Sequence, residues 1–220
     1  MHLPSHIIAV SDQTASALRH QLHYHGPLTV AANGIDYEAI ANVTAATEKS
    51  DVVFVGRLIA HKNVPMLIEA VSILQAKYPH LQVKIMGDGP QAADIKQLIR
   101  DRNLTSCVTL LSGVDDDTKF AIMKAATVFA TPSSREGFGI TVLEANAAGL
   151  PVVTIDAPEN AARHLITAAN GTVCSATPQA LAEAISYWLE HPHNHRSQNI
   201  AKTYDWSVPA QKLLAEYQPS

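Results

Sequence analysis

The sequence predicts an α/β protein built on a doubly wound parallel sheet. Short runs of β-branched and other apolar residues recur at 52–55, 83–86, 108–111, 127–131 and 152–155. The segments between these runs are long enough for helices, and strands joined through helices form parallel sheets with right-handed crossovers. With 220 residues, of which 47% are hydrophobic, the chain is long enough for one such core and some additional elements.

Caps, turns and apolar stripes place the helices between these strands. Residues Val64 to Lys77 carry one apolar stripe formed by Leu67, Ile68, Val71 and Leu74. Pro90 suits the first turn of a helix over 91–100, and Gly149 ends a helix that begins at Ile140. Further helices are predicted over 117–126, 160–166, 178–190 and 207–217, and a last strand over 172–174.

The segment before this alternating region predicts a strand over 6–10, a helix over 12–23 and a strand over 28–31. Ser11 or Asp12 can cap the helix. Asn33-Gly34 is a strong turn signal, and residues 41–50 have the weak periodicity of a linker.

Composition excludes several classes of function. The net charge of −4 and the absence of a basic block argue against nucleic acid as a partner. No apolar run approaches the length of about 18 residues that a transmembrane helix needs, and the N-terminus lacks the features of a signal peptide. Cys107 and Cys174 lie in strand-like runs and are interpreted as buried free thiols of a reducing cytoplasm.

Two clusters of polar residues suggest metal sites, but a simpler interpretation is favoured for both. The histidines at 20, 23, 25, 191, 193 and 195 have no Cys or carboxylate at ligand spacing, so they are interpreted as surface residues. Asp115, Asp116 and Asp117 stand directly before a helix, where aspartates act as caps.

The stretch from Arg135 to Val153 predicts a loop, a short helix and a strand, and it contains two glutamates. Glu136 lies in the loop, and Glu144 lies about one turn inside the helix. Free backbone amides of Phe138, Gly139 and Ile140 at the helix N-terminus favour an anion. Glu144 could accept hydrogen bonds from ribose hydroxyls, and Glu136 suits sugar hydroxyls better than phosphate. The alternative is an ordinary loop with one exposed and one capping glutamate.

Gly56, Arg57 and Lys62 follow the strand at 52–55, at the edge where α/β sheets bind ligands. Two cations without a metal can stabilise a diphosphate, although both could also be solvated loop residues. The Gly87-Asp88-Gly89 turn is explained better by turn chemistry than as a phosphate loop.

These motifs together resemble the GT-B retaining glycosyltransferases, in particular family 4 (glycosyl transferases group 1). Glu136 to Glu144 is similar to the E-x7-E signature of that family, and Phe54-Val55-Gly56-Arg57-Leu58 with Lys62 to its phosphate-binding segment. Gly87-Asp88-Gly89-Pro90 and Pro132-Ser133 resemble two further turns of the family. The pieces occur in the family's order along the whole chain.

The resemblance implies a role for each site residue. Glu136, Arg57 and Lys62 would be catalytic, with Glu136 on the donor sugar and the two cations on the diphosphate. Glu144 would bind the ribose, and Gly113 and Val114 would pack against the base. The donor-binding set is completed by Gly56, Gly137, Phe138, Gly139 and Ile140. No metal and no cofactor is expected, because the nucleotide diphosphate-sugar is itself a substrate.

The resemblance also implies a domain organisation. Residues 1–32 correspond to a remnant of an N-terminal acceptor domain, 33–50 to the linker, 51–203 to the nucleotide-sugar-binding domain and 204–220 to a C-terminal crossover helix. The acceptor, a glycan, lipid or small molecule, would bind mainly through the missing domain. A cytoplasmic protein, or one peripheral to the membrane, is expected. Apolar residues along 5–30 and 207–217 suggest a seam for a homodimer.

Alternatives remain at this point. The chain could be a non-catalytic nucleotide-sugar-binding module that needs a partner acceptor domain, or a sugar-nucleotide epimerase of the same fold. Residues 156–162 lack the glycines of the family's GG-x-x-E motif, so they say nothing about which sugar is bound.

Overall fold

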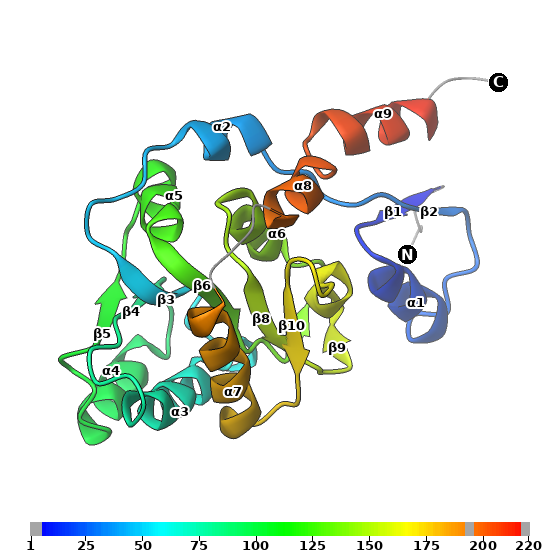
Figure 1. Cartoon of the computed structure of the whole chain (residues 1–220). Coiled ribbons are helices and arrows are strands. Elements are labelled where there is room, and N and C mark those ends of the chain that lie inside the picture. Colours follow the sequence, from blue (N-terminus) through cyan, green and yellow to red (C-terminus); the bar gives the residue numbers. More distant parts are fainter. Residues whose placement is uncertain (1–5, 192–195, 217–220) are drawn as a thin grey trace.

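The computed structural model describes residues 6–191 and 196–216, and its centre is a six-stranded parallel sheet (Figure 1). The strand order is β10-β8-β6-β3-β4-β5. The predicted strands are present with nearly the predicted bounds, which confirms the fold class. They are β3 (Ser50–Val55), β4 (Val83–Met86), β5 (Val108–Leu111), β6 (Ala126–Thr131), β8 (Val152–Ile155) and β10 (Gly171–Cys174).

Helices cover both faces of this sheet. One face carries α3 (Val64–Gln75), α4 (Ala92–Asp101) and α7 (Pro178–Glu190), and the other carries α5 (Asp116–Lys124) and α6 (Ile140–Ala147). Within β3, Val52 and Phe54 belong to the first core cluster and Val53 to the second, as a period of two requires. A strand buried on both faces explains why the sequence shows continuous apolar runs rather than alternation.

The strand order reverses beside β3. From β3 the chain moves outward through α3 to β4 and then to β5. It then returns to the other side of β3 as β6 and continues outward to β8 and β10. The loops after β3 and β6 therefore lead in opposite directions, and ligands of open α/β sheets bind in the crevice that such a reversal leaves at the carboxyl ends.

The N-terminal segment forms a small unit of its own. β1 (Ile7–Ala9) and β2 (Leu28–Val30) are a parallel pair joined through α1 (Asp12–His20), with Ser11 as the N-cap. Helix α1 ends at His20, three residues before the predicted end. The unit lies beside the main sheet (Figure 1), and its contacts to the loop after β7 are part of the site.

The predicted linker over 33–50 contains a helix, α2 (Tyr37–Asn42), which Asp36 caps through the Ala39 amide at 2.9 Å. Two more helices close the described chain, α8 (Arg196–Lys202), which was not predicted, and α9 (Ser207–Glu216). The Ile35 amide donates to the Tyr204 carbonyl at 2.9 Å, and the Trp206 amide donates to the Ile35 carbonyl at 3.0 Å. These two bonds fix the linker against the start of α9.

The helix predicted over 160–166 is confirmed only in part, because it is a short 3-10 helix and its first predicted residue belongs to a strand. The segment is a two-residue strand, β9 (Glu159–Asn160), followed by the 3-10 helix η2 (Ala161–Leu165). β9 pairs with β7 (Arg135–Glu136), and the buried Asn160 amide donates to Thr154 Oγ1 and to the Ile155 carbonyl. These contacts hold the backbone extended at the point where helical periodicity alone suggested a helix.

Other interpretations from the sequence have mixed outcomes. Asp115 caps α5 by accepting from the Thr118 amide at 2.8 Å, and this bond lowers the pKa of the Asp115 carboxyl. Both thiols are free, and burial raises the pKa of Cys174 to about 11, although Cys174 is only half-buried. His193 and His195 lie outside the described residues. Homodimerisation remains a prediction; the large apolar side chains exposed near both ends are Ile8, Leu22, Trp206, Val208 and Leu214.

The Gly87-Asp88-Gly89 turn has a packing role. A Cβ atom at Gly87 would lie 1.9 Å from the Gly56 carbonyl oxygen, and one at Gly89 would lie 2.5 Å from the Leu58 carbonyl oxygen. Both glycines are therefore required for the close approach of this turn to the segment after β3. This explains the G-x-G pattern without a phosphate.

We predict that Gly87→Ala lowers the melting temperature by about 5 to 10 °C, since overpacking against backbone costs about 1–3 kcal/mol and each kcal/mol shifts a domain of this size by about 2–4 °C. Gly137→Ala is the matched control, because no atom lies within 4 Å of a Cβ built there. Thermal unfolding followed by circular dichroism measures both. Equal melting temperatures for the two variants would contradict the packing role.

Candidate functional site

The predicted cations follow β3, next to the reversal of strand order. Arg57 is exposed, and its side chain contacts no partner among the described residues. Lys62 ends the 3-10 helix η1 (Ala60–Lys62). A Cβ atom at Gly56 would lie 3.7 Å from Lys62 Cδ, so the aliphatic stem of Lys62 runs close over Gly56. That distance is ordinary van der Waals contact, so the approach of Lys62 does not itself require glycine at position 56.

Lys62 forms an ion pair with Glu136, which comes from the opposite side of the reversal. The Lys62 Nζ to Glu136 Oε1 distance is 2.5 Å, and the two side chains are only 15% and 13% exposed. The loops that carry them are also joined, because the Ser134 amide donates to the His61 carbonyl at 2.8 Å. Two residues 74 positions apart in sequence thus form the centre of the site.

The segment between Glu136 and α6 contains backbone N–H groups that have no hydrogen-bond acceptor among the described residues. Gly139 is the N-cap of α6 with φ of 100°, and no side chain caps the helix. A Cβ atom at Gly139 would lie 2.4 Å from Ala162 Cβ, so only glycine fits there. The amides of Phe138, Gly139 and Ile140 donate to no acceptor in the part of the chain that the structure describes. This is the arrangement that the sequence predicts for an anion.

The second glutamate of the pair is also bound to a lysine. Lys119 Nζ lies 3.1 Å from Glu144 Oε1 and 2.8 Å from Asp116 Oδ1, and it sits 4.1 Å from the centre of the Phe120 ring. Burial raises the pKa of Glu144, and Lys119 opposes this rise without cancelling it. Burial alone would lower the pKa of Lys119, but its hydrogen bond to Asp116 and the charge of Glu144 outweigh burial and raise it.

The remaining predicted residues lie after β5, at the same carboxyl edge. Gly113 has φ of 66°, and a Cβ atom there would meet nothing within 4 Å, so the backbone conformation is what favours glycine. Val114 is half-buried against the second core cluster. The role predicted for Gly113 and Val114, packing against the nucleotide base, stays a prediction.

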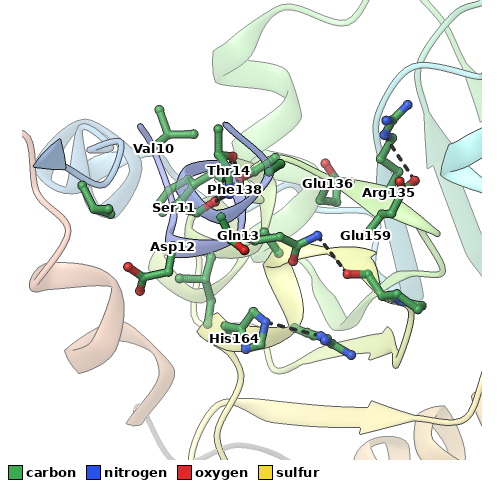
Figure 2. A pocket seen from close by; sticks show the side chains of 18 of the residues that line it. Val10, Ser11, Asp12, Gln13, Thr14, Arg135, Glu136, Phe138, Glu159 and His164 are labelled. Atoms are coloured by element: carbon green, nitrogen blue, oxygen red, sulfur yellow. Dashed lines mark hydrogen bonds and ion pairs between the residues drawn. The ribbon is translucent and has the colours of Figure 1, made fainter. Parts of the chain in front are cut away.

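A cleft of about 1220 Å³ lies between the N-terminal unit and the loop that carries Glu136 (Figure 2). Of the predicted site residues, only Glu136, Gly137 and Phe138 line it. The cleft is also lined by polar side chains that were not among the predicted site residues, including Ser11, Gln13, His20, His61, Arg163 and His164. Arg57, Lys62, Gly113, Val114 and Glu144 do not line it. The cleft therefore begins on the Glu136 side of the ion pair.

Helix α1 and its cap are hydrogen-bonded to the loop that contains Glu136 and Gly137. Ser11 Oγ and Thr14 Oγ1 both donate to the Gly137 carbonyl, at 2.7 and 3.2 Å. Gln13 Nε2 donates to the Pro158 carbonyl at 3.0 Å, as Figure 2 shows. These three polar side chains form one turn of α1 and its cap. The N-terminal unit consequently closes one side of the cleft.

The described residues contain neither a cluster of metal ligands nor a membrane-spanning helix. Over residues 6–191 and 196–216, no three His, Cys, Asp or Glu side chains come together as a metal site would require. No helix in these residues combines the length and the apolar character needed to cross a membrane. Independence from a metal cofactor remains a prediction.

The sequence profile of the glycosyl transferases group 1 matches residues 36–206. The chain belongs to this family. It is 29% identical over 229 residues to a phosphatidyl-myo-inositol mannosyltransferase of Propionibacterium freudenreichii, covering 96% of this chain and 55% of the relative. It is 25% identical over 221 residues to the GDP-mannose:cellobiosyl-diphosphopolyprenol alpha-mannosyltransferase of Komagataeibacter xylinus, covering 96% and 56%.

Solved structures show the same fold as this chain. The Anabaena protein HepE, crystallised with UDP-glucose, has a TM-score of 0.83 at 23% identity, covering 98% of this chain and 64% of that one. The pneumococcal O-GlcNAc transferase GtfA, crystallised with UDP and GlcNAc, has a TM-score of 0.81 at 21% identity, covering 96% and 44%. The Rossmann-like GT-B fold predicted from the motifs is confirmed. The chain spans about half the length of the curated relatives it matches.

We predict that Glu144→Gln stabilises the ligand-free protein at pH 7.5 by on the order of 2 °C, because the raised pKa means that the fold favours the neutral carboxyl. Lys119 keeps Asp116 as a partner in this variant. The difference from wild type should shrink as the pH falls, since protonated wild-type Glu144 then resembles glutamine.

The sign follows from proton linkage. A raised carboxyl pKa contributes stability that is fully present below the unfolded value and is lost as the pH rises through the folded value. Melting temperatures of both proteins between pH 4.5 and 8 test this. A variant that is less stable than wild type at pH 7.5, or a difference that grows on acidification, would contradict it.

Proposed function

We propose that this glycosyltransferase binds a nucleotide diphosphate-sugar as the donor half of a retaining enzyme. One observation carries the proposal. Arg57 and Lys62 follow β3, whereas Glu136, Glu144 and the unbonded amides before α6 follow β6, so all of these groups belong to the two segments that leave the carboxyl edge of the sheet at the reversal of strand order. A diphosphate needs cations and amide donors, whereas sugar and ribose hydroxyls need carboxylate acceptors. The site supplies both kinds of group side by side.

The roles of the residues follow from their chemistry. Arg57, Lys62 and the amides of Phe138 to Ile140 stabilise the negative charge that the diphosphate gains as the glycosidic bond breaks. Glu136 accepts from hydroxyls of the donor sugar. Glu144 accepts hydrogen bonds from the ribose hydroxyls, which replace Lys119 as its partner. Lys119 keeps its ion pair with Asp116. The backbone at Gly113 and Val114 borders the base.

The acceptor is the less determined part of the proposal. The large cleft lies beyond Glu136 and is closed by α1, which is where an attacking hydroxyl would have to arrive. Two relatives are mannosyltransferases, one of which is named for GDP-mannose, and HepE was crystallised with UDP-glucose. GDP-mannose and UDP-glucose are therefore the first donors to test.

The binding test uses calorimetry with GDP, UDP, ADP, GDP-mannose and UDP-glucose. Arg57→Ala/Lys62→Ala should weaken binding of the preferred nucleotide by at least about 100-fold, because each charge-assisted hydrogen bond is worth about 1.5–3 kcal/mol and 1.4 kcal/mol corresponds to tenfold. Lys77→Ala/Arg102→Ala removes the same charge from exposed surface ion pairs and is the control. Equal affinity in both double variants would refute the assignment of the two cations.

A second test concerns transfer. We expect the 220-residue chain alone to bind its donor but to transfer the sugar poorly or not at all, because it spans only about half the length of the relatives it matches. Mass spectrometry of reactions with donor and simple glycoside or lipid acceptors measures this. Transfer by the isolated chain would overturn this expectation, and the anomer formed would then test retention directly.

A further inference from the structure

The diphosphate cation and the sugar carboxylate of the proposed site are bound to each other. Lys62 and Glu136 form the 2.5 Å ion pair, and both side chains are largely buried. The Glu136 carboxylate has no other hydrogen bond or ion pair among the described residues. The bond occupies Oε1 of Glu136 and one of the three ammonium protons of Lys62. In this arrangement each group neutralises the charge of the other, and the ligand must compete with that pairing.

We propose that Lys62–Glu136 is an exchangeable ion pair that makes sugar recognition conditional on the diphosphate. This inference rests on the proposed function. The diphosphate takes Lys62 as its own counter-ion, and Glu136 is released to accept hydrogen bonds from the donor sugar. A free sugar, which brings no anion, does not release Glu136. Lys62 therefore acts on the specificity of the site as well as on the charge of the diphosphate.

The surroundings of the pair favour an exchange of side-chain partners over a movement of loops. The Ser134 amide and hydroxyl both donate to the His61 carbonyl, at 2.8 and 3.3 Å, and fix the loop of Lys62 against the loop of Glu136. β7 and β9 further hold the Glu136 backbone. Lys62 has a long flexible stem over Gly56, so its ammonium can turn to a phosphate while the backbone stays in place.

The anion that displaces Glu136 must supply more charge than one carboxylate. Arg57 is exposed and has no partner in the described chain, and the α6 amides are unbonded. A diphosphate can contact all of these groups together with Lys62, whereas Glu136 satisfies Lys62 alone. Burial also makes an unpaired charge costly, so the released carboxylate needs the sugar hydroxyls as new donors. This couples the two recognition steps.

The decisive variant is Glu136→Gln, which keeps the shape of the side chain but removes its charge. Calorimetry should show the preferred nucleoside diphosphate, without sugar, binding about tenfold more tightly than to wild type, since Lys62 is no longer held by a carboxylate. The additional affinity that the sugar provides should fall at the same time. Glu159→Gln is the matched control, because Glu159 pairs with Arg135 on the strand beside Glu136. It should change the affinity by less than about twofold.

Two further measurements make the outcome unambiguous. In a Lys62→Met background, Glu136→Gln should bring no gain beyond that of Glu159→Gln. In the wild-type protein, saturation-transfer NMR should detect free mannose or glucose only after the nucleoside diphosphate is added, and this arm needs no variant to fold. Melting temperatures confirm the folding of each variant.

The possible results separate the two proposals. If wild type binds a nucleoside diphosphate and Glu136→Gln gains no more than Glu159→Gln, the exchange is refuted and the donor site stands. The same holds if free sugar binds equally well without the diphosphate. If wild type binds none of GDP, UDP and ADP, both proposals fall.

Discussion

The ion pair between Lys62 and Glu136 joins the two halves of the sheet at the point where the strand order reverses. Lys62 comes from the half that runs from β3 to β5, and Glu136 comes from the half that runs from β6 to β10. Each loop leads away from the other half, so side chains must span the crevice between them. The charges that span this crevice are also the groups that a charged, hydroxyl-rich ligand would use.

Both glutamates of the E-x7-E pair have a lysine as their partner in the ligand-free protein. Glu136 is paired with Lys62 and Glu144 with Lys119, and all four side chains are at most 15% exposed. Buried carboxylates without partners would be costly. Each lysine therefore supplies a counter-charge to a largely buried carboxylate. The raised pKa of Glu144 shows that this compensation is incomplete.

The glycines around the site serve different purposes, although they look alike in sequence. Gly87 and Gly89 let one turn approach the backbone after β3, and Gly139 combines a positive φ with contact to η2. A Cβ atom built at Gly137 would have no atom within 4 Å, but the Gly137 carbonyl accepts hydrogen bonds from Ser11 and Thr14 of the N-terminal unit. This contact ties the loop of Glu136 to the segment that precedes the linker, so the shape of the cleft depends on the N-terminal unit as well as on that loop.

The sheet, most helices and the family could be predicted from the amino-acid pattern, because buried parallel strands leave continuous apolar runs and the motifs keep a fixed order. The same pattern singled out Arg57, Lys62, Glu136 and Glu144 as candidates. Which of these groups meet could be seen only in the folded chain, since partners 74 positions apart leave no local pattern. Lys119 was missed for the same reason: its i+3 spacing from Asp116 resembles an ordinary surface pair. η2 and β9 likewise depend on Asn160 reaching β8, a contact that periodicity cannot reveal.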